Sequence, residues 1–209
     1  MIEIFLKGGP IMWPLLATSI AALATALERL MFIWSERRKR QPEVVENFLS
    51  LVERGDVDNA RKAADGSTDF VARTLRYALQ HREESLSSAL LRAANLELKR
   101  FNRGLAVLDT IITLAPLLGL LGTVTGMIHA FGLIGGELNA PTAITGGVAE
   151  ALIATAFGLG IAITALIPFN YLNARSEEAR HEIEDAATHL ELLLVKTSKP
   201  ECALRASQP

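Results

Sequence analysis

The sequence predicts an all-α integral membrane protein with three long transmembrane helices that extend into a cytoplasmic helical domain. Half of the 209 residues are hydrophobic, yet 21% are charged. The apolar residues are concentrated in three blocks, and each block is long enough to cross a bilayer, which needs about 20 mostly apolar residues. The charged segments between and after these blocks predict a substantial soluble part.

The first transmembrane helix is predicted over residues 11–34, after an interfacial segment at residues 1–10 on the outer, periplasmic side. Trp13 and Trp34 stand near its two ends, where aromatic side chains favour the membrane interface. A signal peptide is the competing interpretation, because the Ala24-Thr25-Ala26 sequence resembles a cleavage site. The apolar run is longer than a typical signal-peptide core, so we expect a retained anchor.

Residues 35–103 are polar and predict a cytoplasmic helical domain. Apolar spacing and Gly or Pro breaks predict short helices that begin at Pro42, surround Ala60 and run from Phe70. One continuous helix is then expected from Leu86 into the second apolar block. The helical hairpins are too thin to bury a sizeable independent core, so we expect them to pack on neighbours, including other copies of the chain. Their charges are expected to form a solvated surface, and no phosphate-binding loop or nucleophile–base arrangement occurs among them.

The second transmembrane helix is predicted over residues 104–134, which at about 1.5 Å per residue is longer than the hydrocarbon requires. Asp109 is therefore expected near the inner interface as a charge on the helix surface. Gly119, Gly122 and Gly126 recur at spacings of three and four residues. In a membrane this pattern predicts a close helix–helix contact, because small residues let two backbones approach.

A short external loop at residues 135–142 leads to the third transmembrane helix at residues 143–172, whose one charged residue is Glu150. A charged side chain in hydrocarbon costs at least about 2.5–3.5 kcal/mol and is a functional candidate by default. The simpler alternative is a carboxylate that lies at headgroup depth and faces water. Gly158 belongs to a set of small residues on this helix and predicts tight packing.

Beyond the third span we expect a cytoplasmic helix over residues 173–197 and a disordered tail over residues 198–209. Of the 21 Lys and Arg residues, 14 lie in residues 35–103 and five follow the third span, whereas Lys7 alone precedes the first. The positive-inside rule therefore predicts an external N-terminus and a cytoplasmic C-terminus. The net charge of −2 argues against nucleic-acid binding, and the single Cys202 suggests neither a metal site nor a catalytic thiol. We expect no enzyme activity and no cofactor.

Two segments closely resemble the MotA/TolQ/ExbB proton channel family, most of all its ExbB group, with the TolQ group second. They are APLLGLLGTVTGMIHAF at 115–131 and GGVAEALIATAFGLGIAITALIPFNYL at 146–172. The resemblance implies a homopentamer in the bacterial inner membrane, with the second and third helices around the single transmembrane helices of an ExbD/TolR-like partner. It also implies that the proton-motive force drives the complex, which energises a TonB- or TolA-like protein for transport at the outer membrane.

By the same resemblance, Thr123 and Thr155 match pore threonines and Glu150 matches the glutamate that precedes the second of them. These three are the candidate ion-pathway residues, because hydroxyls can pass protons through water. Membrane threonines also often bond to their own helix backbone, which is the structural alternative. A TolQ-type subunit, a MotA-type flagellar stator and a non-conducting scaffold are the alternative functions, and MotA-type chains usually have four transmembrane helices. The sequence does not distinguish proton from sodium, and it does not identify the transported substrate or the partner stoichiometry.

Overall fold

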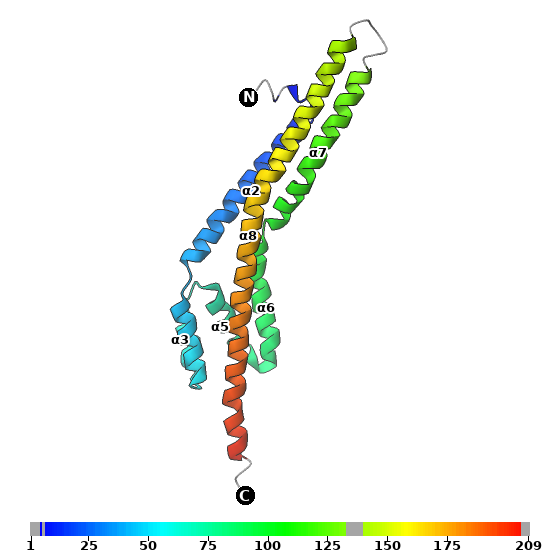
Figure 1. Ribbon diagram of the computed structural model, residues 1–209. Coiled ribbons are helices and arrows are strands. Elements are labelled where there is room, and N and C mark those ends of the chain that lie inside the picture. Colours follow the sequence, from blue (N-terminus) through cyan, green and yellow to red (C-terminus); the bar gives the residue numbers. More distant parts are fainter. Residues whose placement is uncertain (1–4, 6, 133–139, 206–209) are drawn as a thin grey trace. The chain divides into compact units, whose positions relative to one another are not determined.

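The computed structural model describes residue 5 and residues 7–132 and 140–205, which form helices joined by short turns. The helices, shown in Figure 1, are α2 (Met12–Arg38), α3 (Pro42–Glu53), α4 (Val57–Ala63), α5 (Phe70–Gln80), α6 (Arg82–Asn102), α7 (Leu105–Gly132) and α8 (Ala140–Arg205). Three of them, α2, α7 and α8, contain an apolar window long enough to cross a membrane. The prediction of an all-α protein with three candidate membrane spans is therefore confirmed.

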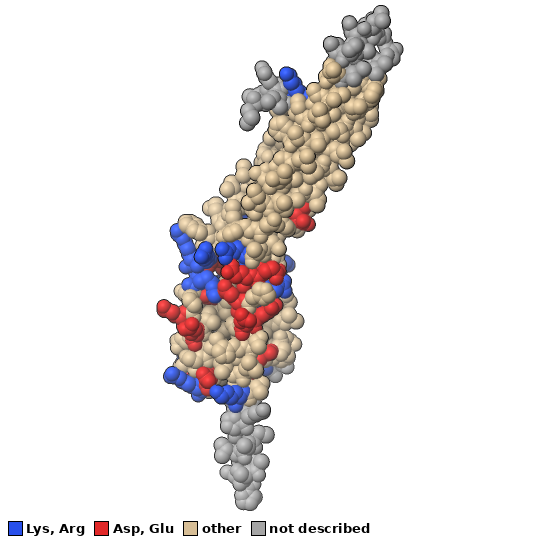
Figure 2. All heavy atoms as spheres, in the orientation of Figure 1, with Lys and Arg blue, Asp and Glu red and all other residues tan. Residues whose placement is uncertain are grey.

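The chain forms two compact units, and α2 and α8 each contribute to both. The first unit comprises residues 1–31 and 104–173, and the second comprises residues 32–103 and 174–209. Figure 2 shows that, on the face drawn, charged side chains gather over the second unit, whereas the first unit is almost entirely uncharged. The apolar spans and the charged helices thus belong to different units.

A glycine interrupts the helix that was expected to run without a break from Leu86 into the membrane. The helix α6 ends at Asn102, and Gly104 has a φ of +82°. A Cβ atom at Gly104 would also lie 3.1 Å from side-chain carbons of Thr25 and Arg29. Positive φ and lack of space both favour glycine here, so the prediction of a continuous helix was wrong.

The helix α8 is continuous from Ala140 to Arg205. The sequence predicted a span at 143–172, a separate cytoplasmic helix at 173–197 and a disordered tail from residue 198. In the structure the helix passes through both predicted helices without a break, because no glycine or proline occurs between residues 169 and 199. It continues to Arg205, so the predicted tail is helical as far as that residue. The rest of the tail and most of the predicted external loop lie outside the described residues.

An apolar core holds the second unit together, and the short helices, which were expected to bury no sizeable core independently, form it together with α6 and α8. Phe48 and Val52 of α3, Leu75 of α5, Leu90 of α6 and Leu190 of α8 are all buried in it. Burial of such side chains stabilises by about 1.5–3 kcal/mol each relative to exposure. The expectation considered the short helices alone, whereas α8 completes the core from a distant part of the chain.

Asp69 accepts several hydrogen bonds in the second unit, and its side chain is fully buried. Both of its oxygens accept hydrogen bonds from Nη1 of Arg40 at 2.6 Å. The backbone N–H groups of Gln41 and Val71 donate to it at 2.7 and 2.8 Å. Asp69 is thus the N-cap of α5 and also fixes the segment that follows α2.

A second charged cluster surrounds Glu36, which is 3% exposed near the end of α2. Its carboxylate lies 3.2 Å from Lys39 Nζ and 3.6 Å from Arg100 Nη2. The guanidinium of Arg73 donates to Glu97 through Nε at 3.0 Å and Nη2 at 2.7 Å, and this hydrogen bonding raises the pKa of Arg73. The expectation that the charges of this region form only a solvated surface was therefore wrong for the charged residues that lie between helices.

Replacement of Asp69 by Asn should lower the free energy of unfolding by about 3 kcal/mol, because removal of one partner breaks a buried ion pair. Asp65→Asn is the matched control, since that carboxylate is 75% exposed and pairs with Arg76. The control should lower the free energy of unfolding by less than about 1 kcal/mol, because exposed ion pairs contribute little. Thermal unfolding followed by circular dichroism in detergent measures both, and equal losses would contradict the structural role of Asp69.

Candidate functional site

Three glycines of α7, namely Gly119, Gly122 and Gly126, lie directly against α8 in the first unit. A Cβ atom added at Gly119 would lie 3.0 Å from the Cα atom of Thr155, and one at Gly126 would lie 2.9 Å from the carbonyl oxygen of Gly147. At Gly122 the added carbon would overlap a side chain of α8. Side chains at these positions would hold the two helices apart.

Gly158 is the facing residue on α8. A Cβ atom there would lie 3.1 Å from the Cα atom of Gly119, and it would also crowd the carbonyl oxygen of Ala115. Two glycines that face each other let the backbones approach more closely than any other residues allow. The four glycines that the sequence predicted as packing positions therefore lie at one contact between α7 and α8, the two adjacent helices in Figure 1.

Thr155 links the two helices by a hydrogen bond at this contact. Its hydroxyl donates to the carbonyl oxygen of Gly119 on α7 at 3.0 Å. The structural alternative, in which a membrane threonine bonds to its own helix, therefore does not describe Thr155. The bond uses the only hydroxyl proton, and the oxygen keeps lone pairs that can accept a proton donor such as water.

Thr123 differs from Thr155, because its hydroxyl donates to the carbonyl oxygen of Leu120 within α7 at 2.7 Å. It shares one face of α7 with Asp109 and Thr113, since the three positions fall within about 80° around a helix of 3.6 residues per turn. Asp109 and Thr113 are exposed and Thr123 is half-buried. These three residues, together with Pro116 and Leu120 between them, are called the polar stripe of α7 below.

Glu150 lies in a different environment, beside the turn that precedes α2. A Cβ atom at Gly9, which has a φ of +73°, would collide with the carboxylate of Glu150. A Cβ atom at Gly8 would lie 3.2 Å from the side chain of Ile153, one helical turn further along α8. The Gly8-Gly9-Pro10 turn therefore packs against the part of α8 that carries Glu150, and the carboxylate is half-buried there.

The structure brings Thr155 together with the packing glycines but does not join it to Glu150. Within the described part of the chain, no hydrogen bond links Glu150 to Thr123 or Thr155. The sequence predicted a short interfacial turn at residues 7–10 but did not connect Gly9 with Glu150, although a Gly-Gly-Pro turn is a signal for close backbone approach. It also missed Ser19 and Thr164, which line a cavity of about 180 Å³ between α2 and α8.

Comparison with known proteins gives matches to one family. The sequence pattern of the family described as the MotA/TolQ/ExbB proton channel family matches residues 62–185. An ExbB-like biopolymer transport protein from Synechocystis is 38% identical over 201 residues, which cover 92% of this chain and 78% of that protein. An ExbB homologue from Methanothermobacter thermautotrophicus is 31% identical and covers 88% of this chain and 67% of its own length.

A shorter match involves the biopolymer transport protein ExbB of Neisseria gonorrhoeae. It is 38% identical over 105 residues, which cover 48% of this chain and 47% of that protein. The matched family and the names of these relatives confirm the resemblance that the two apolar segments suggested.

Gly119→Ala should lower the free energy of unfolding by about 1–3 kcal/mol, because the added methyl group overpacks a backbone contact. The matched control is Gly160→Ala on α8, where an added Cβ atom meets nothing within 4 Å. The control should be neutral or stabilising by up to about 1 kcal/mol through helix propensity. Thermal unfolding in detergent compares the two variants, and an unchanged melting temperature in Gly119→Ala would show that the α7–α8 contact is looser than described.

Proposed function

The chain belongs to the MotA/TolQ/ExbB proton channel family, and we propose that it is an ExbB-type subunit of an ion-driven motor for biopolymer transport. In this proposal it forms a homopentamer in the bacterial inner membrane, with its N-terminus in the periplasm and its C-terminus in the cytoplasm. An ExbD/TolR-like protein with a single transmembrane helix is its partner. The complex uses the proton-motive force to energise a TonB-like protein for transport at the outer membrane.

The polar stripe of α7 is the observation that carries this proposal. Asp109 and Thr113 are exposed on a helix that is otherwise apolar enough to cross a membrane. Ionisable side chains within membrane helices, such as that of Asp109, almost always face the interior of a bundle or a water-filled cavity. One chain with three spans encloses little space, so the stripe needs further helices around it, from copies of the chain and from a partner.

Thr123 and Thr155 would flank the ion route in this assembly. Thr155 is anchored to Gly119 at 3.0 Å, so its hydroxyl oxygen has a fixed position and open lone pairs. Thr123 follows the same helix and belongs to the polar stripe. Glu150, beside the Gly8-Gly9-Pro10 turn, would act at the outer end of the route and favour the entry of a cation.

The membrane gradient supplies enough energy for such a motor. One elementary charge that crosses 100 mV releases about 2.3 kcal/mol. The free energy released when several charges cross in one cycle would therefore exceed the 1–3 kcal/mol that typically couples two sites in a protein. The sequence contains no nucleotide-binding motif, which favours the gradient as the energy source.

Energy-dependent uptake through an outer-membrane transporter tests the proposal in cells that co-express the chain with its single-span partner. Thr155→Val, Thr123→Val and Glu150→Gln should each reduce uptake by up to about tenfold, the effect of losing about 1.4 kcal/mol of stabilisation on the ion route. Thr18→Val is the matched control, because the Thr18 hydroxyl donates to Leu15 of its own helix α2 at 2.8 Å. It should leave uptake unchanged.

All variants must reach the membrane at wild-type levels and in the same oligomer for this comparison. Full uptake in the three pathway variants would overturn the assignment of these residues and favour a non-conducting scaffold. Loss of uptake in Thr18→Val to the same extent would show that any lost hydroxyl in these helices impairs assembly.

A further inference from the structure

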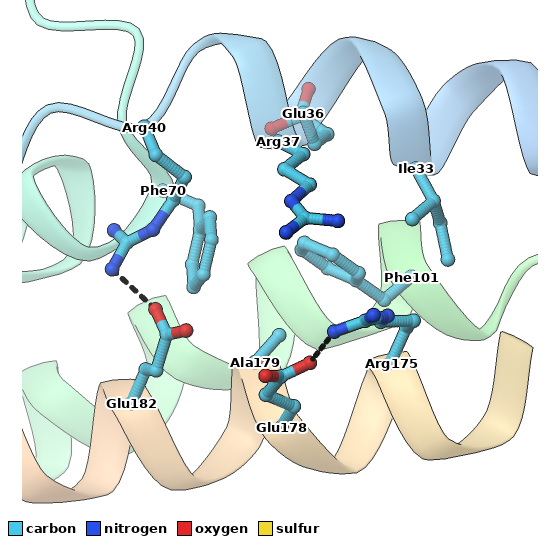
Figure 3. A pocket seen from close by; sticks show the side chains of 10 residues that line it. All are labelled: Ile33, Glu36, Arg37, Arg40, Phe70, Phe101, Arg175, Glu178, Ala179 and Glu182. Carbon is cyan, nitrogen blue, oxygen red and sulfur yellow. Dashed lines mark hydrogen bonds and ion pairs between the residues drawn. The ribbon is translucent and has the colours of Figure 1, made fainter. Parts of the chain in front are cut away.

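The second unit contains a cavity of about 310 Å³ that the proposed ion route does not use. Its walls come from the end of α2, from α5 and α6, and from α8 where the apolar run has ended (Figure 3). Phe70 and Phe101 form part of its apolar lining. Its charged lining consists of Glu36, Arg37, Arg40, Arg175, Glu178 and Glu182.

All but one of these charged groups have partners. Arg40 forms ion pairs with Asp69 and Glu182, and Arg175 forms one with Glu178. Oε1 of Glu36 faces Lys39 and Arg100, as described above, whereas its buried Oε2 accepts no hydrogen bond from the described residues and lies 4.0 Å from Nη2 of Arg73. Burial raises the pKa of Glu182, and the nearby Arg40 opposes this shift.

Arg37 is the exception, because no ion pair joins it to any residue that the structure describes. Figure 3 shows its guanidinium extending from α2 toward Phe101 and the cavity. The carboxylates of the lining each lie within ion-pair distance of another cation, and Arg37 is exposed, so its guanidinium is open to an anion that enters the cavity. A guanidinium binds phosphate oxygens especially well, because its planar fork of donors can form two parallel hydrogen bonds.

The position of the cavity along the helices indicates where this anion comes from. Trp34 is the last apolar residue of the first run and Leu172 the last of the third. Arg37 and Arg175 each follow three residues later, which corresponds to about 4.5 Å along a helix. The headgroup layer on each side of a bilayer is about 5–7 Å thick, so both residues are level with lipid phosphates.

A cation–π pair next to Arg37 supports its position at the depth of the lipid headgroups. Trp34 is 59% exposed, and the guanidinium of Arg38 lies over its ring, 3.5 Å from the ring centroid. Tryptophan side chains are enriched at this level of a membrane, where one end of the ring is apolar and the other is wet. Arg37 lies next to this pair in the sequence but lines the cavity, which Arg38 does not.

We propose that this cavity binds the phosphodiester group of a membrane phospholipid from the leaflet at this end of the helices. Arg37 donates hydrogen bonds to the phosphate oxygens, and the part of the lipid next to the phosphate lies against Ile33, Phe70 and Phe101 of the cavity lining. Arg175 stands at the same depth and adds positive potential, which Glu178 partly neutralises. The site is independent of the ion route, because it uses none of the residues of the polar stripe.

Native mass spectrometry of the delipidated full-length protein, titrated with palmitoyl-oleoyl-phosphatidylglycerol, tests the proposal. Arg37→Gln should weaken the tightest lipid-binding step about tenfold, the loss expected for one charge-assisted contact. Arg38→Gln is the matched control, because it removes the same charge one residue away and should change affinity less than twofold. Equal losses in the two variants would overturn the proposal, since they would indicate attraction to surface charge rather than a site.

Two further measurements, one on a second variant and one with a soluble phosphate, test the proposal if Arg37→Gln proves unstable. Glu178→Gln removes the carboxylate that pairs with Arg175, so it should strengthen lipid binding severalfold, and unchanged or weaker binding would count against the site. Glycerol 3-phosphate supplies the same phosphate without acyl chains and should not displace the lipid at millimolar concentration. Displacement at that concentration would show that the cavity takes a soluble phosphate and not a lipid.

Discussion

The close approach of α7 and α8 at Gly119 and Gly158 is the contact on which the other features of the first unit depend. With any larger residue at these positions, the hydroxyl of Thr155 would not reach the carbonyl oxygen of Gly119. Lipid provides no hydrophobic force between membrane helices, so such packing and interhelical hydrogen bonds hold them together. The same contact fixes which face of α7 is covered, and it leaves the polar stripe with Asp109 and Thr113 exposed.

The second unit is organised by different forces. Its apolar core needs the long α8 to complete it, and its ion pairs lie where α2, α5, α6 and α8 meet. Buried ion pairs contribute little net stability, because desolvation offsets most of their attraction, but removal of one partner is costly. These clusters therefore serve mainly to define one arrangement of the helix ends. Among the cations that line the cavity of this unit, Arg37 is the one for which the described residues provide no ion pair.

The sequence was most informative where a pattern is local. The three spans, the short helix that begins at Pro42 and the glycines that face α8 all follow from residue type and spacing within one helix. The break at Gly104 was missed, because the apolar pattern continues through it and the lack of space comes from Thr25 and Arg29, which are distant in the sequence. The burial of Asp69 was missed for a related reason, since its partner Arg40 is 29 residues away. Likewise, nothing in the sequence near Glu150 indicated that Gly9 would lie beside it.

Proton flux into sealed vesicles tests the central claim most directly. The purified chain would be reconstituted with and without its single-span partner, and a potassium diffusion potential would drive protons past an enclosed pH-sensitive dye. We expect proton flux that requires both proteins and that falls when Thr155, whose hydroxyl joins α7 to α8, is changed to Val. Flux that is absent with both proteins present, or that is the same in the variant, would contradict an ion route along these helices.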